Sequence, residues 1–346
     1  MSLDISQFDY KLPEGRIALY PAEPRDSSRL MFLPRFLDEI GHLRFEDFPE
    51  CLLEGDLVVV NDSKVFPARL HGHKIGSGGK VEVFLLHRIE EKVWEALVRP
   101  GRRLPPGTQV DFFDGKLGAT LEDRTANGGR IVKFECNGDL LTIIWEHGEI
   151  PLPPYINRLP EEEDKFRYQT IYAEKIGAVA APTAGFHFTD SVLKRLKERG
   201  VQVVTLTLHP GLGTFRPITR TNIDQHHMHE ENFIIPEETA VAINRALKEQ
   251  RRIIAVGTTT VRALESACDI DGLIITKGWR ETDIFIRPPY KFNVIDGMLT
   301  NFHLPKSTLL LMVSAFAGRD RIMAAYEAAI EKGYRFYSYG DAMLIL

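Results

Sequence analysis

Cysteine is scarce in this chain of 346 residues. Only Cys51, Cys136 and Cys268 occur, and no two of them form a CxxC pair. This spacing argues against a disulfide framework and against a zinc site built from thiolates. It fits a reducing compartment, and we expect a cytoplasmic protein.

Long apolar runs and an excess of basic residues are also missing. The longest strongly apolar run, 309–317, is too short to cross a bilayer, and residues 1–10 lack the pattern of a signal peptide. We therefore expect no membrane contact. The formal net charge of -5 argues against a generally basic coat for nucleic acid, although it leaves room for a local basic stripe.

The stretch from about residue 63 to 150 is rich in short apolar strands separated by Gly, Pro, Asn and Asp turns. This rhythm is typical of an antiparallel barrel or sandwich. We interpret residues 63–150 as an all-β domain, an antiparallel β-barrel, inserted into a larger one. The expected strands are 65–75, 81–89, 93–100, 109–113, 117–123, 130–136 and 140–145.

Residues 1–62 and 151–346 have a different texture. A short buried strand is expected at 57–62, and from residue 177 onward strands alternate with amphipathic helices, such as the one expected at 236–250. Alternation of this kind predicts an α/β domain. We expect a mixed sheet with function gathered at the carboxyl ends of its strands.

Three histidines follow apolar stretches at expected strand ends. His187 lies in GAVAAPTAGFHFT, His209 in LHPGLGTF and His303 in TNFHLPKST. Small residues in these stretches leave room for a ligand, so a shared cleft is predicted. The alternative for any one of them is a buried, hydrogen-bonded histidine of the core. The neighbouring polar or small residues expected to bind substrate are Thr183, Gly185, Thr214 and Ser307.

A fourth candidate segment is VGTTTVRALE. Gly257, Thr258 and Thr259 come after an apolar strand and before a helix, so backbone amides and hydroxyls are expected at a helix N-terminus. Such a site suits a carboxylate, a phosphate or a ribose hydroxyl, and Arg262 strengthens that interpretation. Simple helix capping by the hydroxyl groups is the alternative.

The most polar cluster of the chain is HHMHEE at 226–231. Its imidazoles and carboxylates could ligate a divalent metal, but no further patterned ligand set accompanies them. We favour a strand of hydrogen-bonding residues at the cleft edge, with His229 as a substrate-binding residue, and we predict no metal site.

Basic residues gather at two places where RNA contact is expected. Arg99, Arg102 and Arg103 lie at one tip of the expected barrel, where guanidinium groups suit phosphate oxygens; a solubilising loop is the alternative. Arg167 and Tyr168 lie in the connector that leaves the barrel. One is expected to clamp an anion and the other to stack on a base, with an ion pair to Glu163 or Asp164 as the alternative explanation for the arginine.

Long motifs spread over nearly the whole chain resemble those of the S-adenosylmethionine:tRNA ribosyltransferase-isomerase family. They include YPAEPRDSSRL, VNDSKVFPARL, PLPPYI, RYQTIYA, GAVAAPTAGFHFT, LHPGLGTF, HHMHEE, AVGTTTVRALE, TDIFI, TNFHLPKSTLL and RFYSYGDAML. The resemblance implies an α/β domain with an inserted β-barrel, as the strand pattern already suggests.

The resemblance also implies an enzyme of queuosine biosynthesis. Such an enzyme moves the ribosyl part of S-adenosylmethionine onto 7-aminomethyl-7-deazaguanine at the wobble position of tRNA, and forms epoxyqueuosine with release of adenine and methionine. S-adenosylmethionine is then a consumed substrate, so no separate cofactor is expected. The partners are this tRNA and S-adenosylmethionine, and we expect a monomer.

This chemistry needs a general base and a general acid, and imidazoles suit both near neutral pH. Our hypothesis is that His187 and His303 transfer protons, while Asp283 or Glu230 orients groups or balances the cationic sulfonium. Gly257–Thr259 and Arg262 would hold the methionine carboxylate or the ribose. Two other functions stay open from the residues alone: a non-catalytic RNA-binding module, and a different nucleoside-directed transferase.

Overall fold

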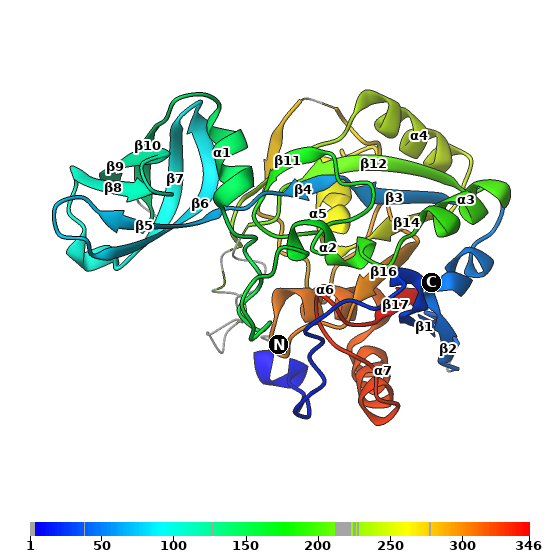
Figure 1. Ribbon diagram of the computed structural model, residues 1–346. Coiled ribbons are helices and arrows are strands. Elements are labelled where there is room, and N and C mark those ends of the chain that lie inside the picture. The colour runs from blue at the N-terminus through cyan, green and yellow to red at the C-terminus, as the bar shows by residue number, and fades with distance from the viewer. Residues whose placement is uncertain are drawn as a thin grey trace.

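A mixed sheet of nine strands forms the main body of the computed structural model, which describes residues 4–37, 39–125, 128–211, 223, 226, 228–276 and 278–346 (Figure 1). Its central strands are parallel, whereas β13, β15, β17 and β2 introduce antiparallel pairs. The predicted α/β domain with a mixed sheet is therefore confirmed. In spatial order the strands are β15 (Arg280–Thr282), β13 (Glu231–Ile234), β12 (Gln202–Leu208), β3 (Leu57–Asn61), β14 (Ile253–Val256), β16 (Gly297–Asn301), β17 (Ala342–Ile345), β1 (Arg29–Leu33) and β2 (Gly41–Arg44).

The centre of this sheet is buried on both faces. Along β3, Leu57 and Val59 pack into the core on one face, while Val58 and Val60 pack into the core on the other. Strands covered on both sides read as continuous apolar runs, which is why the VVV stretch of β3 shows no alternation.

Helices cover the two faces unequally. The first face packs against α4 (Glu237–Lys248), α5 (Thr258–Ala267), α6 (Thr308–Ala317) and α7 (Arg319–Glu331), and the second against α3 (Asp190–Glu198). Side-chain oxygens of Thr189 and Ser307 accept hydrogen bonds at the start of α3 and α6, respectively, so local polar residues set where these helices begin.

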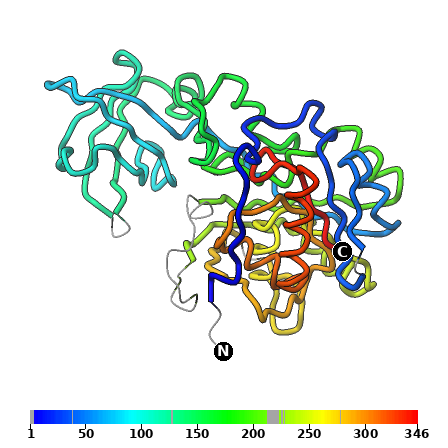
Figure 2. Tube along the Cα trace, turned by 90° about the horizontal axis from the view of Figure 1, so that it is seen from below, coloured from blue at the N-terminus to red at the C-terminus, as the bar shows by residue number. Residues whose placement is uncertain are grey.

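The second body is a closed antiparallel barrel of six strands, which confirms the predicted β-barrel. In Figure 2 it projects from the main body as the cyan and green part of the tube. Its core contains buried aromatic and aliphatic side chains such as Phe112 and Phe134. Around the barrel the strands are β10 (Arg130–Glu135), β7 (Val93–Arg99), β6 (Lys80–Glu90), β5 (Arg69–Lys74), β8 (Thr108–Phe112) and β9 (Leu117–Arg124).

The strand predicted at 140–145 is wrong, because this segment is the helix α1 (Leu140–His147). The carboxylate of Asp139 accepts a hydrogen bond from the backbone of Thr142 and caps the helix. Leu140 and Ile144, one helical turn apart, are both buried against the barrel core.

A small parallel sheet joins the two bodies. It consists of β4 (Ser63–Val65) and β11 (Lys175–Ala178), and the short helix α2 (Asp164–Arg167) precedes β11. The side-chain amide of Gln169 bonds the backbone of Val65 in both directions, at 3.0 and 2.6 Å. The domain boundaries near residues 63 and 150 stay a prediction.

The strand predicted at 226–231 is also wrong for the part of it that is described, since regular strand begins only at Glu231. His227 lies outside the described residues. Among the described residues, no helix is both long enough and apolar enough to cross a bilayer.

Candidate active site

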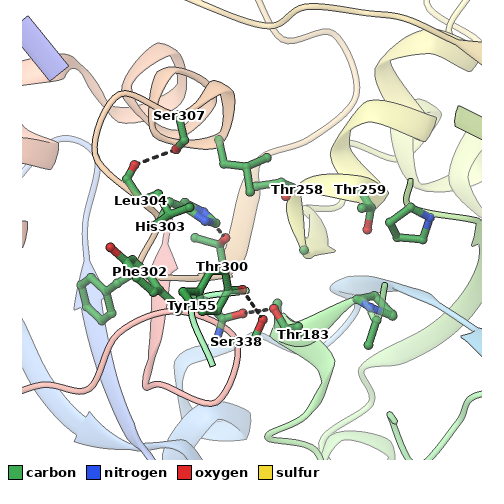
Figure 3. Close-up of a pocket in the computed structure, with 18 residues that line it drawn as sticks. Tyr155, Thr183, Thr258, Thr259, Thr300, Phe302, His303, Leu304, Ser307 and Ser338 are labelled. Carbon is green, nitrogen blue, oxygen red and sulfur yellow. Dashed lines mark hydrogen bonds between the residues drawn. The ribbon is translucent and has the colours of Figure 1, made fainter. Parts of the chain in front are cut away.

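A cleft opens at the carboxyl edge of the central sheet, where the parallel strands β14 and β16 end (Figure 3). The empty space between its walls, including the open mouth, is about 620 Å³. The segment that precedes β17 supplies a further wall. The described lining residues with polar side chains are Tyr155, Thr183, Thr258, Thr259, Thr300, Asn301, His303, Ser307, Tyr337 and Ser338.

The N-terminus of α5 forms one wall of this cleft. Gly257 has φ of 90° and ψ of 149°, a conformation that is essentially restricted to glycine, and it turns the chain from β14 into the helix. Thr258 and Thr259 are the first two residues of α5 and line the cleft, and the Thr259 hydroxyl accepts a 3.3 Å hydrogen bond from the side-chain amide of Asn61. The predicted helix N-terminus thus lies at the cleft, and the first amides of an α-helix have no partner within the helix itself.

His303 lies in the opposite wall. Its Nε2 atom is 2.8 Å from the hydroxyl oxygen of Thr300, and the hydroxyl of Tyr326 accepts a hydrogen bond from its backbone amide. Burial lowers the pKa of His303 to about 3, so the ring is neutral near pH 7 and one ring nitrogen is unprotonated. Ser307, also in this wall, caps α6.

A smaller hollow continues the cleft along α5. It shares Thr258, Thr259 and Leu309 with the cleft and is also lined by His229 and Arg262. Arg262 is buried and pairs with the carboxylate of Glu231, and its NH2 group donates to the carbonyl of Thr282 at 3.3 Å. The guanidinium is therefore held by protein groups, apart from its buried Nε atom, which has no hydrogen-bond partner among the described residues.

His187 lies behind the cleft, outside its lining as the described residues form it. Its Nδ1 atom is 2.7 Å from the hydroxyl of Ser28, and its Nε2 atom is 3.3 Å from the side-chain amide of Asn301. Burial, with a smaller effect of Arg335 and Arg25, lowers the pKa of His187 to about 3. The structure thus separates the two histidines that were predicted to transfer protons.

Two further predicted substrate-binding residues also lie beside the cleft rather than in its described lining. His209 stacks on Trp279 with ring centroids 5.2 Å apart, and its Nδ1 atom is 3.2 Å from the Ser63 hydroxyl; burial lowers its pKa to about 4. Gly185 is buried where a Cβ atom would lie 2.1 Å from the hydroxyl of Tyr172, so a close approach of chain segments requires glycine there.

The acidic candidates are at the surface. Asp283 and Glu230 are both exposed and lie outside the linings that the described residues give to the cleft and the smaller hollow. Thr214, also predicted to bind substrate, lies outside the described residues.

The residues predicted to contact RNA divide into two groups. Arg99, Arg102 and Arg103 are exposed at one tip of the barrel. Arg167 forms an ion pair, but with Glu23 rather than with the expected Glu163 or Asp164, and Asp164 pairs with Arg158. Tyr168 is fully buried, with its ring edge-on to Phe186 and Tyr339, so in this structure its ring is not available for stacking on a base.

Five polar lining residues were missed in the sequence, namely Tyr155, Thr300, Asn301, Tyr337 and Ser338. Asn301 is a polar residue at the end of the apolar strand β16, and its position beside Thr300 is a signal that could have identified it. Tyr155 and Ser338 join the wall from distant segments, with their hydroxyl oxygens 2.6 Å apart. Nothing in their local pattern indicates this meeting.

A mixed α/β sheet with a polar cleft at its carboxyl edge and an inserted barrel defines a two-body α/β enzyme. The family model for a queuosine biosynthesis protein matches residues 5–345, and the chain belongs to this family.

Relatives support this assignment over their whole length. The chain is 54% identical to the S-adenosylmethionine:tRNA ribosyltransferase-isomerase of Halothermothrix orenii and 50% identical to that of Heliobacterium modesticaldum, with 99% of this chain and 100% of each relative covered. The crystal structure of an S-adenosylmethionine tRNA ribosyltransferase from Thermotoga maritima is similar, with 38% identity, a TM-score of 0.56, and coverage of 98% of this chain and 100% of that one.

Proposed function

We propose that this enzyme transfers and isomerises the ribosyl part of S-adenosylmethionine onto 7-aminomethyl-7-deazaguanine at the wobble position of tRNA, with release of adenine and methionine. The observation that carries the proposal is the identity of 50% or more to relatives of this name over essentially the whole chain. S-adenosylmethionine is a substrate in this reaction, and the reaction needs no separate cofactor.

The chemistry of the cleft supports this proposal. S-adenosylmethionine presents a carboxylate, an ammonium group, ribose hydroxyls and a sulfonium. The N-terminus of α5 with Thr258 and Thr259 suits the carboxylate or the ribose, because this helix end and both threonines line the cleft. Apolar lining residues such as Leu309 and Phe302 suit the adenine ring.

His303 is our candidate for proton transfer. It lines the cleft, and its burial keeps an unprotonated ring nitrogen available near pH 7. The hydrogen bond between the Thr300 hydroxyl and Nε2 of His303 orients the ring. Asp283 and Glu230 could contribute only if their segments approach the bound substrates, because both are exposed in the free chain.

The test is release of free adenine from S-adenosylmethionine in the presence of tRNA that carries 7-aminomethyl-7-deazaguanine. We expect His303→Ala to lower the rate by about 10²- to 10⁴-fold, the usual contribution of a general acid or base. The control is His42→Ala, on the exposed edge strand β2. Absence of adenine release by the unaltered chain would contradict the proposed reaction, and full activity of His303→Ala would remove His303 from it.

A further inference from the structure

Four side chains from distant segments form a hydrogen-bonded row that ends in the cleft. Ser28, His187 and Asn301 are buried, at 2%, 4% and 4% exposure, and Thr183 follows at the cleft wall. The separations along the row are 2.7 Å from Ser28 to His187, 3.3 Å from His187 to Asn301 and 2.8 Å from Asn301 to Thr183. Figure 3 shows Thr183 among the residues that line the cleft.

The direction of these hydrogen bonds follows from the groups that meet. The Thr183 hydroxyl donates to Oδ1 of Asn301, so the Nδ2 group of Asn301 faces Nε2 of His187. An amide NH2 group can only donate, hence Nε2 of His187 accepts. A neutral imidazole then carries its proton on Nδ1, which donates to the oxygen of Ser28.

A neutral ring is what this arrangement needs. Burial lowers the pKa of His187 to about 3, and the nearby guanidinium groups of Arg335 and Arg25 act in the same direction. An imidazolium would donate from both nitrogens and would require the opposite orientation of the Asn301 amide. The Thr183 proton would then be released toward the cleft.

The space beside His187 is smaller than the cleft. The hollow that His187 lines with Arg25 and Ser338 measures about 190 Å³ on the basis that gives 620 Å³ for the cleft, and Ser338 lines both spaces. Among the described residues, the row through Asn301 and Thr183 is a hydrogen-bonded connection from His187 to the cleft.

We propose that His187 is a positioning residue, which acts through Asn301 to hold the Thr183 proton away from the cleft and so makes the Thr183 oxygen a hydrogen-bond acceptor for a substrate N–H or O–H group. Such groups are the ribose hydroxyls, the ammonium group and the attacking amine. Only the identity of this substrate rests on the proposed function. This role takes the place of the direct proton transfer that the sequence predicted for His187.

The kinetic test compares three substitutions by adenine release. Thr183→Val removes the acceptor oxygen and keeps the shape, and we expect kcat/KM to fall about tenfold, the effect of one lost hydrogen bond. His187→Ala should cause a similar loss. His187→Gln places an acceptor oxygen near the position of Nε2 and should retain activity within about threefold, with an unchanged pH profile.

The decisive variant combines His187→Ala with Thr183→Val. If His187 acts through the Thr183 hydroxyl, its loss adds less than about threefold once that hydroxyl is gone. Additive losses in the combined variant, or inactivity of a folded His187→Gln protein, would overturn the proposal. Thermal unfolding of each variant reports whether it is folded.

A spectroscopic measurement on the free protein needs no substrate. In ¹⁵N-histidine NMR, with the His187→Gln spectrum to assign the resonance, we expect the proton of the unaltered ring on Nδ1. In Asn301→Asp the new carboxylate can only accept, so Nε2 should become protonated. A proton on Nε2 in the unaltered protein would overturn the proposed direction of the hydrogen bonds. Failure of the proposed function would appear separately, because adenine release would then be absent while the NMR result stays as expected.

Discussion

Burial decides what the histidines of this chain can do. His187 and His303 are both enclosed, and burial lowers the pKa of each to about 3, from an ordinary value of 6.5. The folded protein therefore holds both rings neutral at pH values where the unfolded chain would bind a proton on each. This difference couples stability to pH.

We predict that acidification below about pH 6.5 destabilises the fold through these two residues and through His209, whose pKa burial lowers to about 4. The unfolded state gains protons there while the folded state does not until about pH 4 to 3, so the free energy of unfolding falls by up to about 1.4 kcal/mol per pH unit for each ring. Urea unfolding between pH 7 and 5 measures this slope.

The matched comparison uses one buried and one exposed histidine. His303→Gln should reduce the pH slope by about a third, since it removes one of the three rings whose pKa burial lowers to about 3 or 4. His73→Gln, on the exposed side of β5, should leave the slope unchanged. A slope that is the same in His303→Gln as in the unaltered chain would show that other groups set the acid sensitivity.

The sequence indicated many of the cleft residues but not their neighbours. His303, Thr258 and Thr259 could be predicted because each follows an apolar strand, and strand ends of a parallel sheet share one edge. Burial of Tyr168 and the placement of His187 behind Asn301 could not, because both depend on packing between segments far apart in the chain.

At the scale of elements, the entry to α5 controls the cleft. Only glycine takes the backbone conformation found at position 257 without strain. The helix that follows begins with Thr258 and Thr259. A Cβ atom at position 257 would lie 3.6 Å from the Thr259 hydroxyl, which is ordinary contact. Backbone strain, not crowding, is therefore the effect of a substitution there.

We predict that Gly257→Ala costs about 1–3 kcal/mol of stability and also weakens the binding of S-adenosylmethionine, because the first turn of α5 shifts. Gly272→Ala is the control: Gly272 also has positive φ, of 80°, and no atom within 4 Å of an added Cβ, and it is half-buried and outside the cleft lining that the described residues form. Both variants should lose stability in thermal unfolding, but only Gly257→Ala should raise KM. A raised KM in Gly272→Ala would contradict this account.

Element type was predicted well where the periodicity was long and poorly where it was short. The helix at 236–250 was recognised over several turns and is α4, whereas the six residues 140–145 fit both a strand and a helix. The cap from Asp139 and the burial of Leu140 and Ile144 on one side decide for the helix. The choice between strand and helix therefore depends on packing against the barrel, which the sequence of this segment does not show.

At the scale of the whole molecule, the barrel presents its arginines away from the main body's core. Arg102 and Arg103 are exposed in a short turn after β7. We predict that the double charge reversal Arg102→Glu with Arg103→Glu weakens tRNA binding and lowers the slope of log K against log salt by about 1.5, if each contacts one phosphate.

The control for this prediction is a charge reversal of equal size elsewhere. Lys194→Glu with Lys197→Glu changes two exposed residues of α3 in the main body. It should leave both the affinity and its salt dependence near those of the unaltered chain. Filter binding of tRNA at several salt concentrations distinguishes the two variants, and equal salt slopes in both would reject the barrel tip as the RNA surface.

The barrel's two chain ends meet at its base, where Arg69 and Glu149 exchange two backbone hydrogen bonds of 3.2 and 2.9 Å. For the surrounding α/β body, the entire intervening stretch then behaves like a short loop, because its ends are already held together. The entropy of closing that loop grows only slowly with its length. The α/β body can thus hold an inserted barrel of this size, or a larger or smaller one, with little change in its free energy of unfolding.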